Sequence, residues 1–113
     1  MTVEPLPPDA FRGRRLLRDG PWVVAFLADW CPFCRSFRTD FEGVDGGGSF
    51  RSGIADLTDG DSPLWDDFAI DVVPAIVVFS NGRPILGLQS DPGVGLPPDA
   101  LDRARSAAEA SSR

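Results

Sequence analysis

The sequence predicts an α/β fold with a central mixed sheet of four to five strands and helices on both faces of the sheet. Two short apolar runs, Val23–Ala28 and Ile76–Phe79, are typical of strands that are covered on both sides. Asn81-Gly82 follows the second run and precedes Pro84–Leu88, which indicates a tight hairpin between antiparallel strands. Helical segments separate the earlier strands, so parallel and antiparallel pairs should share one sheet.

Weaker signals add two strands and four helices. Gly53–Leu57 is a weaker strand candidate, and Thr2–Leu6 is a short edge strand at best, because Pro5 has no N–H for a neighbouring strand. The expected helices are Asp9–Arg18, the segment from Cys34 to Gly46-Gly47-Gly48, Pro63–Phe68 and Pro98–Ser111. The first of them should carry a solvent-facing ridge made by Arg12, Arg14, Arg15 and Arg18.

Length and composition narrow the class of protein. The 113 residues fit one domain, 1–113, with a single hydrophobic core. No apolar run approaches the roughly 18 residues that a membrane span requires, and the first residues lack the order of a secretory signal, so we expect a cytoplasmic protein without membrane contact. The net charge of −6 argues against nucleic acid as a partner, because phosphate binding needs a basic face.

The two cysteines of the chain stand together in Trp30-Cys31-Pro32-Phe33-Cys34, at the end of an apolar strand. A zinc or iron–sulfur site needs about four ligands, and the chain has no histidine and no third cysteine, so we expect no metal. A disulfide here would close a very short loop and would stabilise the fold little. A chance pair in a reduced chain stays open, but the strand-to-helix context favours a redox-active pair.

The position of each cysteine suggests its role. The thiolate is the nucleophile in disulfide exchange, and Cys31 should lie at the start of a helix, where unpaired N–H groups and the helix dipole favour an anion. Cys34 falls one turn later, on the apolar stripe of that helix, so it should be shielded and protonated. We therefore expect Cys31 to attack and Cys34 to resolve the mixed disulfide.

The WCPFC stretch, residues 30–34, together with Val73-Pro74 before a strand that ends in Phe79-Ser80-Asn81-Gly82, resembles the thioredoxin family. The similarity extends over about residues 9 to 88 and implies the thioredoxin fold. It also implies that Pro74 is cis, faces the cysteines and presents the Val73 backbone to an extended substrate segment. The substrate-binding residues that it suggests, which should form an apolar docking platform with a groove glycine beside it, are Trp30, Pro32, Phe33, Val73, Pro74 and Gly95.

The chain departs from the family pattern in two ways. Thioredoxins carry a buried acid and a buried lysine behind the cysteines, and those places correspond here to Ala25 and Ala55. Asp29 or water would then have to take the proton of Cys34. The dipeptide between the cysteines is Pro32-Phe33, which is closer to that of glutaredoxins.

The resemblance implies a thiol–disulfide oxidoreductase, active in electron transport, that exchanges disulfides with protein partners and is restored by an external reductase or low-molecular-weight thiol. We expect a monomer with no bound cofactor. A glutathione-linked, glutaredoxin-like activity is one alternative, although Trp30 and Val73 weaken it. A partner-binding module that has lost turnover is another. Trp65 is interpreted as core or rim packing.

Overall fold

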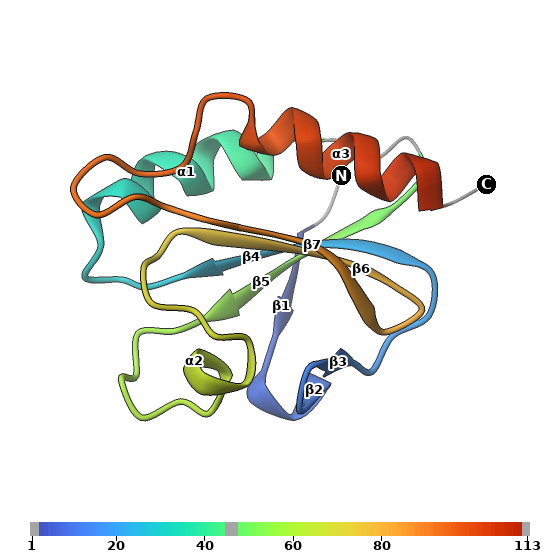
Figure 1. The fold of residues 1–113 in the computed structure, drawn as a ribbon, viewed down its shortest axis with the longest axis horizontal. Coiled ribbons are helices and arrows are strands. Elements are labelled where there is room, and N and C mark those ends of the chain that lie inside the picture. Colours follow the sequence, from blue (N-terminus) through green and yellow to red (C-terminus); the bar gives the residue numbers. More distant parts are fainter. Residues whose placement is uncertain (1–2, 45–47, 112–113) are drawn as a thin grey trace.

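A computed structural model describes residues 3–44 and 48–111 of the chain. Its main sheet has five strands in the order β1-β5-β4-β6-β7 (Figure 1). Strands β1, β5 and β4 are parallel, whereas β6 is antiparallel to β4 and β7 is antiparallel to β6. The bounds are β1 (Val3–Leu6), β4 (Pro21–Leu27), β5 (Arg51–Asp56), β6 (Ala75–Ser80) and β7 (Arg83–Gln89). The predicted mixed sheet is therefore confirmed.

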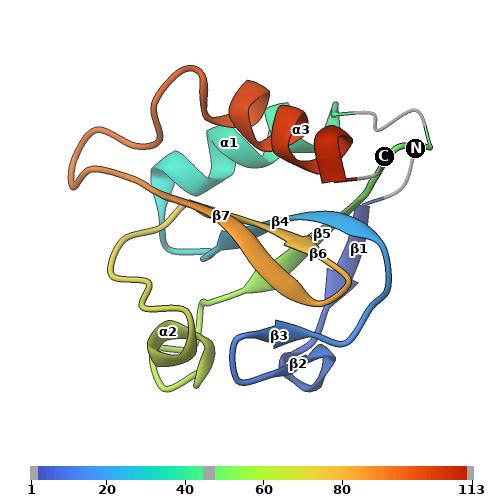
Figure 2. The same cartoon turned by 45° about the vertical axis from the view of Figure 1, so that its right-hand side comes forward.

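Helices cover both faces of the sheet, as predicted. Helices α1 (Pro32–Glu42) and α3 (Ala100–Ser111) lie on one face, and the short α2 (Leu64–Asp67) lies on the other (Figures 1 and 2). The second face is filled by rings from four separate elements, whose centroids lie 5.3 to 6.2 Å apart: Phe11, Phe26, Phe68 and Phe79. Within the described ranges, no helix is long and apolar enough to span a bilayer.

The predicted helix Asp9–Arg18 is wrong. A 3-10 turn, η1 (Pro8–Ala10), leads into a small antiparallel pair, β2 (Phe11–Arg12) and β3 (Arg15–Leu16). Gly13 reverses the chain with a φ of 59°, a conformation that glycine adopts without steric cost. The reversal makes Phe11 and Leu16 cross-strand partners, and both are buried. The arginine ridge is consequently not a helix face, and Arg12, Arg14 and Arg15 are exposed on the hairpin.

The ends of other predicted elements differ by a few residues. Helix α1 ends at Glu42 with Gly43 as its cap, before the glycine triplet, of which Gly46 and Gly47 lie outside the described residues. Thr2, the expected start of the first strand, also lies outside them.

The hairpin between β6 and β7 forms as predicted. Asn81 and Gly82 both have positive φ, 51° and 87°, which is the requirement of a type I′ turn. The Asn81 side chain accepts a hydrogen bond from the backbone N–H of Gly20 at 2.8 Å, and Gly82 O accepts one from Leu16 N at 3.0 Å. The turn thereby fixes the start of β4 and the small hairpin to the rest of the sheet.

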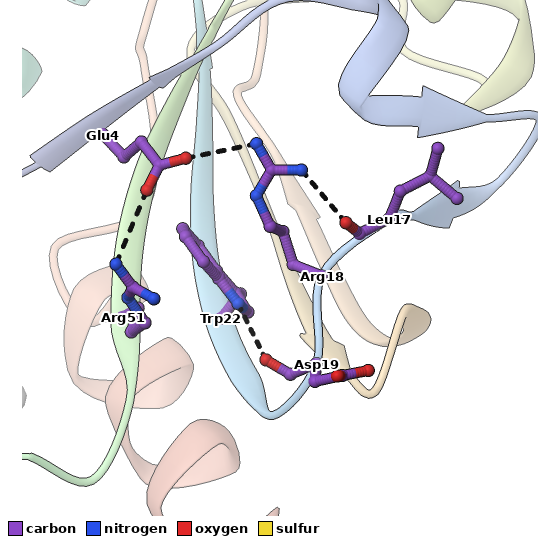
Figure 3. Close-up of polar contacts among 6 residues, drawn as sticks. All are labelled: Glu4, Leu17, Arg18, Asp19, Trp22 and Arg51. Carbon is purple, nitrogen blue, oxygen red and sulfur yellow. Dashed lines mark hydrogen bonds and ion pairs between the residues drawn. The ribbon is translucent and has the colours of Figure 1, made fainter.

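A polar cluster attaches the edge strand β1 to its neighbours (Figure 3). Glu4 forms ion pairs with Arg18 at 3.2 Å and with Arg51 at 3.6 Å. The Arg51 guanidinium lies over the buried Trp22 ring, 5.1 Å from its centroid, and Trp22 Nε1 donates to Asp19 O. The ion pairs are partly exposed, so each contributes about 0–1 kcal/mol. Their main effect is to define where β1 joins the sheet.

Close packing of β1 against β5 gives a testable difference between two strand glycines. A Cβ on Gly53 would lie 2.5 Å from Leu6 Cδ1 and 3.2 Å from Glu4 O, whereas a Cβ on Gly87 would meet nothing within 4 Å. We expect Gly53→Ala to lower the free energy of unfolding by about 1–3 kcal/mol through overpacking. The matched control Gly87→Ala should change it by less than about 0.5 kcal/mol. Urea denaturation measures both, and equal effects would contradict this packing.

Candidate active site

The two cysteines lie where β4 passes into α1. Cys31 has extended backbone geometry and is the N-cap of the helix. Pro32 occupies the first helical position, where its missing N–H leaves no donor unpaired. Cys31 Sγ accepts a hydrogen bond from the backbone N–H of Cys34 at 3.3 Å. An N–H of the first helical turn thus points at this sulfur, the arrangement that favours negative charge on it.

The segment before β6 approaches the same sulfur from another side. Cys31 Sγ donates to Val73 O at 3.5 Å, and the Val73–Pro74 peptide bond is cis. Pro74 is fully buried, and its carbonyl accepts a hydrogen bond from Ser90 Oγ at 2.6 Å. The structure therefore brings the two cysteines together with Val73 and Pro74, although Cys31 and Pro74 are 43 positions apart in the sequence.

Both cysteines are free thiols, and both are buried. Cys31 is 5% exposed and Cys34 is 2% exposed, so the attacking sulfur expected from the sequence is itself almost covered. Burial raises the pKa of the Cys34 thiol to about 12, with further increases from its hydrogen bond to Cys31 and from negative charge on Cys31. A hydrogen bond with the Ala28 backbone lowers the pKa and offsets part of this rise. Cys34 is therefore a protonated, shielded thiol in the reduced site.

The residues predicted to form the apolar platform fall into two groups. Trp30 is 58% exposed and Phe33 is 43% exposed, and Pro32 between the cysteines is exposed as well. The side chains of Val73 and Pro74 are buried instead, so they support the site from behind. Gly95 has a φ of 93°, and a Cβ there would lie 3.3 Å from the Phe33 ring, so the glycine packs against the platform edge.

Trp65 packs at the rim of the core, as predicted, and it also lies beside the cysteine site, which the sequence did not reveal. Its ring stacks on Trp30, with centroids 6.3 Å apart and an interplanar angle of 8°. Trp30 Nε1 donates to Thr58 O and Trp65 Nε1 donates to Asp59 O, each at 3.1 Å. No local spacing relates these two tryptophans, because the contact forms only when α2 folds back beside the cysteines.

Ala25 and Ala55 do not face each other, so the pair expected from the sequence is wrong. The parallel register aligns Ala25 with Ile54 and Ala55 with Phe26. Because neighbouring residues of a strand point to opposite faces, Ala55 lies on the Phe26 side of the sheet, away from α1. The residue beside Ala25 on the α1 side is Ile54, and neither carries a charge.

A groove of about 930 Å³ lies behind Cys34, lined by residues of α1 and of strands β1, β4 and β5. Its polar lining includes the carboxylates of Asp29, Asp56 and Glu42 together with Arg35 and Arg38. Of these, Glu42 is ion-paired with Arg38 at 3.6 Å. Residues 3–44 and 48–111 contain no group of three acidic, cysteine or histidine side chains that could hold a metal ion.

The fold and this cysteine site define a known family. The family model "Thioredoxin" matches residues 3–91, which is most of the sequence, and the chain belongs to the thioredoxin family. The chain is 31% identical over 88 residues to the protein disulfide-isomerase like 2-2 of Arabidopsis thaliana. That match covers 74% of this chain and 19% of the relative, so the chain spans about a fifth of that protein's length.

Solved thioredoxins share the fold. The chain superposes on the thioredoxin Mala s 13 of Malassezia sympodialis with a TM-score of 0.72 and 24% identity, covering 96% of this chain and 91% of that one. The long form of thioredoxin f from spinach chloroplast gives a TM-score of 0.74 and 18% identity, covering 99% and 88%. The family model places the chain in the thioredoxin family, and the solved structures share its fold.

The high pKa of Cys34 can be tested by alkylation. Only the thiolate reacts, so Cys34 should resist iodoacetamide in the reduced protein well above pH 9. Cys31→Ser removes the negative charge and the thiol partner at position 31, but it leaves Cys34 buried, and burial is the largest cause of the raised Cys34 pKa. The pKa of Cys34 should then fall below about 12 yet stay above its ordinary 9.0. Mass spectrometry measures the alkylation rate of Cys34 as a function of pH, and circular dichroism verifies that the variant is folded. If the alkylation rate has its midpoint at or below pH 9.0, burial does not raise the pKa of Cys34.

Proposed function

We propose that this chain reduces or exchanges disulfides of protein partners, with Cys31 as the nucleophile and Cys34 as the resolving thiol. One observation carries the proposal: Cys31 Sγ accepts the Cys34 N–H at the N-terminus of α1 and lies 3.5 Å from Val73 O. A sulfur so placed can hold negative charge while it faces the segment that precedes the cis-proline.

The first step is attack on the partner. The Cys31 thiolate bonds to one sulfur of the partner's disulfide, the partner's S–S bond breaks, and the other sulfur leaves as a thiolate that takes up a proton. Ionisation of Cys31 also ends its donation to Val73 O. That carbonyl then becomes available to accept an N–H from an extended segment of the partner, which would also meet the exposed side chains of Trp30 and Phe33.

The second step needs the proton of Cys34. Cys34 loses its proton and attacks Cys31 Sγ, the bond between Cys31 and the partner breaks, and the partner leaves with both sulfurs reduced. The pair has then given up two electrons as its own disulfide. With alanine at position 25, the carboxylates that share the groove with Cys34 are Asp29, Asp56 and the paired Glu42. We assign the proton transfer to Asp29 or Asp56, through water in the groove.

An external reductant, either a reductase or a low-molecular-weight thiol, restores the two thiols by disulfide exchange in the opposite direction. No bound cofactor takes part in these steps. We propose that the chain works as a monomer in the cytoplasm, where thiols are kept reduced.

Cysteine variants test the assignment of the two roles. In insulin reduction with dithiothreitol, the wild-type chain should accelerate precipitation and Cys31→Ser should abolish the acceleration. Cys34→Ser should still attack but stall, because no resolving thiol is present, so covalent partner complexes should accumulate and be released by excess dithiothreitol. Turnover seen only with glutathione would favour the glutaredoxin-like alternative. Partner binding without turnover would favour the non-catalytic module.

Carboxylate variants test the proton step. Whichever of Asp29→Asn and Asp56→Asn removes the proton acceptor should slow release of the mixed disulfide by about 100-fold at neutral pH, the low end of the range for a general base, while the attack step is unchanged. Glu42→Gln is the matched control, because it removes a groove carboxylate that is already ion-paired. Rapid-quench kinetics separates the two steps. Release unaffected by both Asn variants would leave solvent as the proton acceptor.

A further inference from the structure

The exposed surface beside Cys31 is a rigid aromatic one. Trp30 is 58% exposed, and its ring lies parallel to that of Trp65. Both indole N–H groups donate to adjacent carbonyls of one loop, Thr58 O and Asp59 O. The loop is itself held, since Thr58 Oγ1 accepts from Asp29 N and Thr58 N donates to Asp56 Oδ1, each at 2.9 Å. The indole pair thus keeps its orientation without a partner.

Carboxylates are concentrated on the α2 side of this surface. Residues 52–82, which include the loop and α2, contain six aspartates and no arginine or lysine. Asp59, Asp61 and Asp66 are exposed next to the indole pair, and Asp29 is exposed beside Trp30. None of these four carboxylates takes part in an ion pair within residues 3–44 and 48–111. The nearest basic side chain along the chain, Arg35, donates to the backbone carbonyl of Asp29 at 3.4 Å.

We propose that the stacked indoles of Trp30 and Trp65, with the carboxylates of Asp59, Asp61 and Asp66, bind a positively charged side chain that flanks the reactive disulfide of a protein partner. The proposal rests on the function proposed above and specifies the class of partner. It concerns the segment of the partner that approaches from the α2 side of Cys31.

A cation suits this surface better than an apolar segment does. An apolar side chain on the indoles would strip water from nearby carboxylates and give them no new partner. A guanidinium can lie flat on an indole face and donate to carboxylates at the rim, and tryptophan is the strongest aromatic partner for a cation. These carboxylates, which form no ion pair in the described part of the chain, would also attract a basic partner before contact and raise its rate of encounter.

Three peptide disulfides test the proposal. They are identical except for the residue two positions from the attacked cysteine, which is arginine in the first, glutamate in the second and glutamine in the third. The second-order rate constant for reduction by the reduced chain is divided by that for dithiothreitol, which removes differences in the reactivity of the peptides themselves. The arginine peptide should react about five- to tenfold faster than the glutamate peptide at low salt. The ratio should shrink as salt screens the carboxylates.

Two variants place the effect on this surface. Asp59→Asn with Asp66→Asn should bring the ratio of arginine to glutamate rates down to about twofold or less, because most of the attraction is Coulombic. Asp19→Asn with Asp102→Asn is an equal change of charge at two exposed positions, one before β4 and one on α3, which covers the other face of the sheet from α2, and it should keep the wild-type ratio. A ratio near one in the wild-type chain, or an equal fall in both double variants, would overturn the proposal.

The same experiment separates failure of this inference from failure of the proposed function. If the chain reduces the glutamine peptide but shows no preference for the arginine peptide, only the cation-binding inference is contradicted. If the chain reduces none of the peptides, the proposed function is contradicted as well. The surface could instead bind a second copy of the chain through its hairpin arginines, Arg12, Arg14 and Arg15. Sedimentation at low and high salt tests this alternative, because it measures the oligomeric state. A salt-sensitive dimer that blocks the peptide preference would assign the surface to self-association and overturn the proposal.

Discussion

The site depends on one hydrogen bond, from the backbone N–H of Cys34 to Sγ of Cys31 at the beginning of α1. This hydrogen bond forms because the central strand β4 is followed closely by the N-terminus of α1. Pro32 can begin that helix because its missing N–H leaves no donor unpaired. Strand β6 is antiparallel to β4, so the segment before β6 ends beside the same helix start. The sheet topology therefore brings Val73 O and the helix N-terminus to one sulfur atom.

The two thiols differ because they occupy successive positions on one helical turn. Cys31 is at the N-cap, where the backbone supplies a donor, whereas Cys34 is one turn later and buried, with only 2% of its surface exposed. Burial is the largest cause of the rise in the Cys34 pKa, and negative charge on Cys31 adds to it. Negative charge on Cys31 therefore disfavours loss of the Cys34 proton. In the proposed reaction, Cys34 accordingly reacts in the second step.

Local patterns predicted the parts of the molecule that local chemistry determines. The apolar runs of β4 and β6, the Asn81-Gly82 turn and the N-capping position of Cys31 each follow from adjacent residues. The segment Asp9–Arg18 was predicted wrongly, because its apolar residues fit a helix as well as a hairpin. Contacts of Phe11 with rings from β4, α2 and β6 favour the hairpin, and none of these contacts is visible within the segment.

Parts of the site that depend on register or on distant contacts could not be predicted in this way. A shift of one residue in a parallel pair reverses the face of a side chain, and the sequence does not specify that shift, so Ala55 was assigned to the wrong side of the sheet. The stacking of Trp65 on Trp30 likewise requires α2 to be placed beside the cysteines. The cysteine pair could be predicted without knowledge of strand register or distant contacts, because its spacing and its place at the start of a helix follow from adjacent residues.

The loop after β5 connects the two surfaces that the proposed reaction uses. Asp56, which lines the groove behind Cys34, accepts the N–H of Thr58, and Thr58 in turn accepts from Asp29 N and from Trp30 Nε1. The groove that would receive the proton and the indole surface that would receive the partner are therefore held by one set of hydrogen bonds. Because Ala25 is not ionisable, we propose that carboxylates at this edge accept the proton of Cys34. A partner that alters the loop while docking would then also alter the environment in which Cys34 loses its proton.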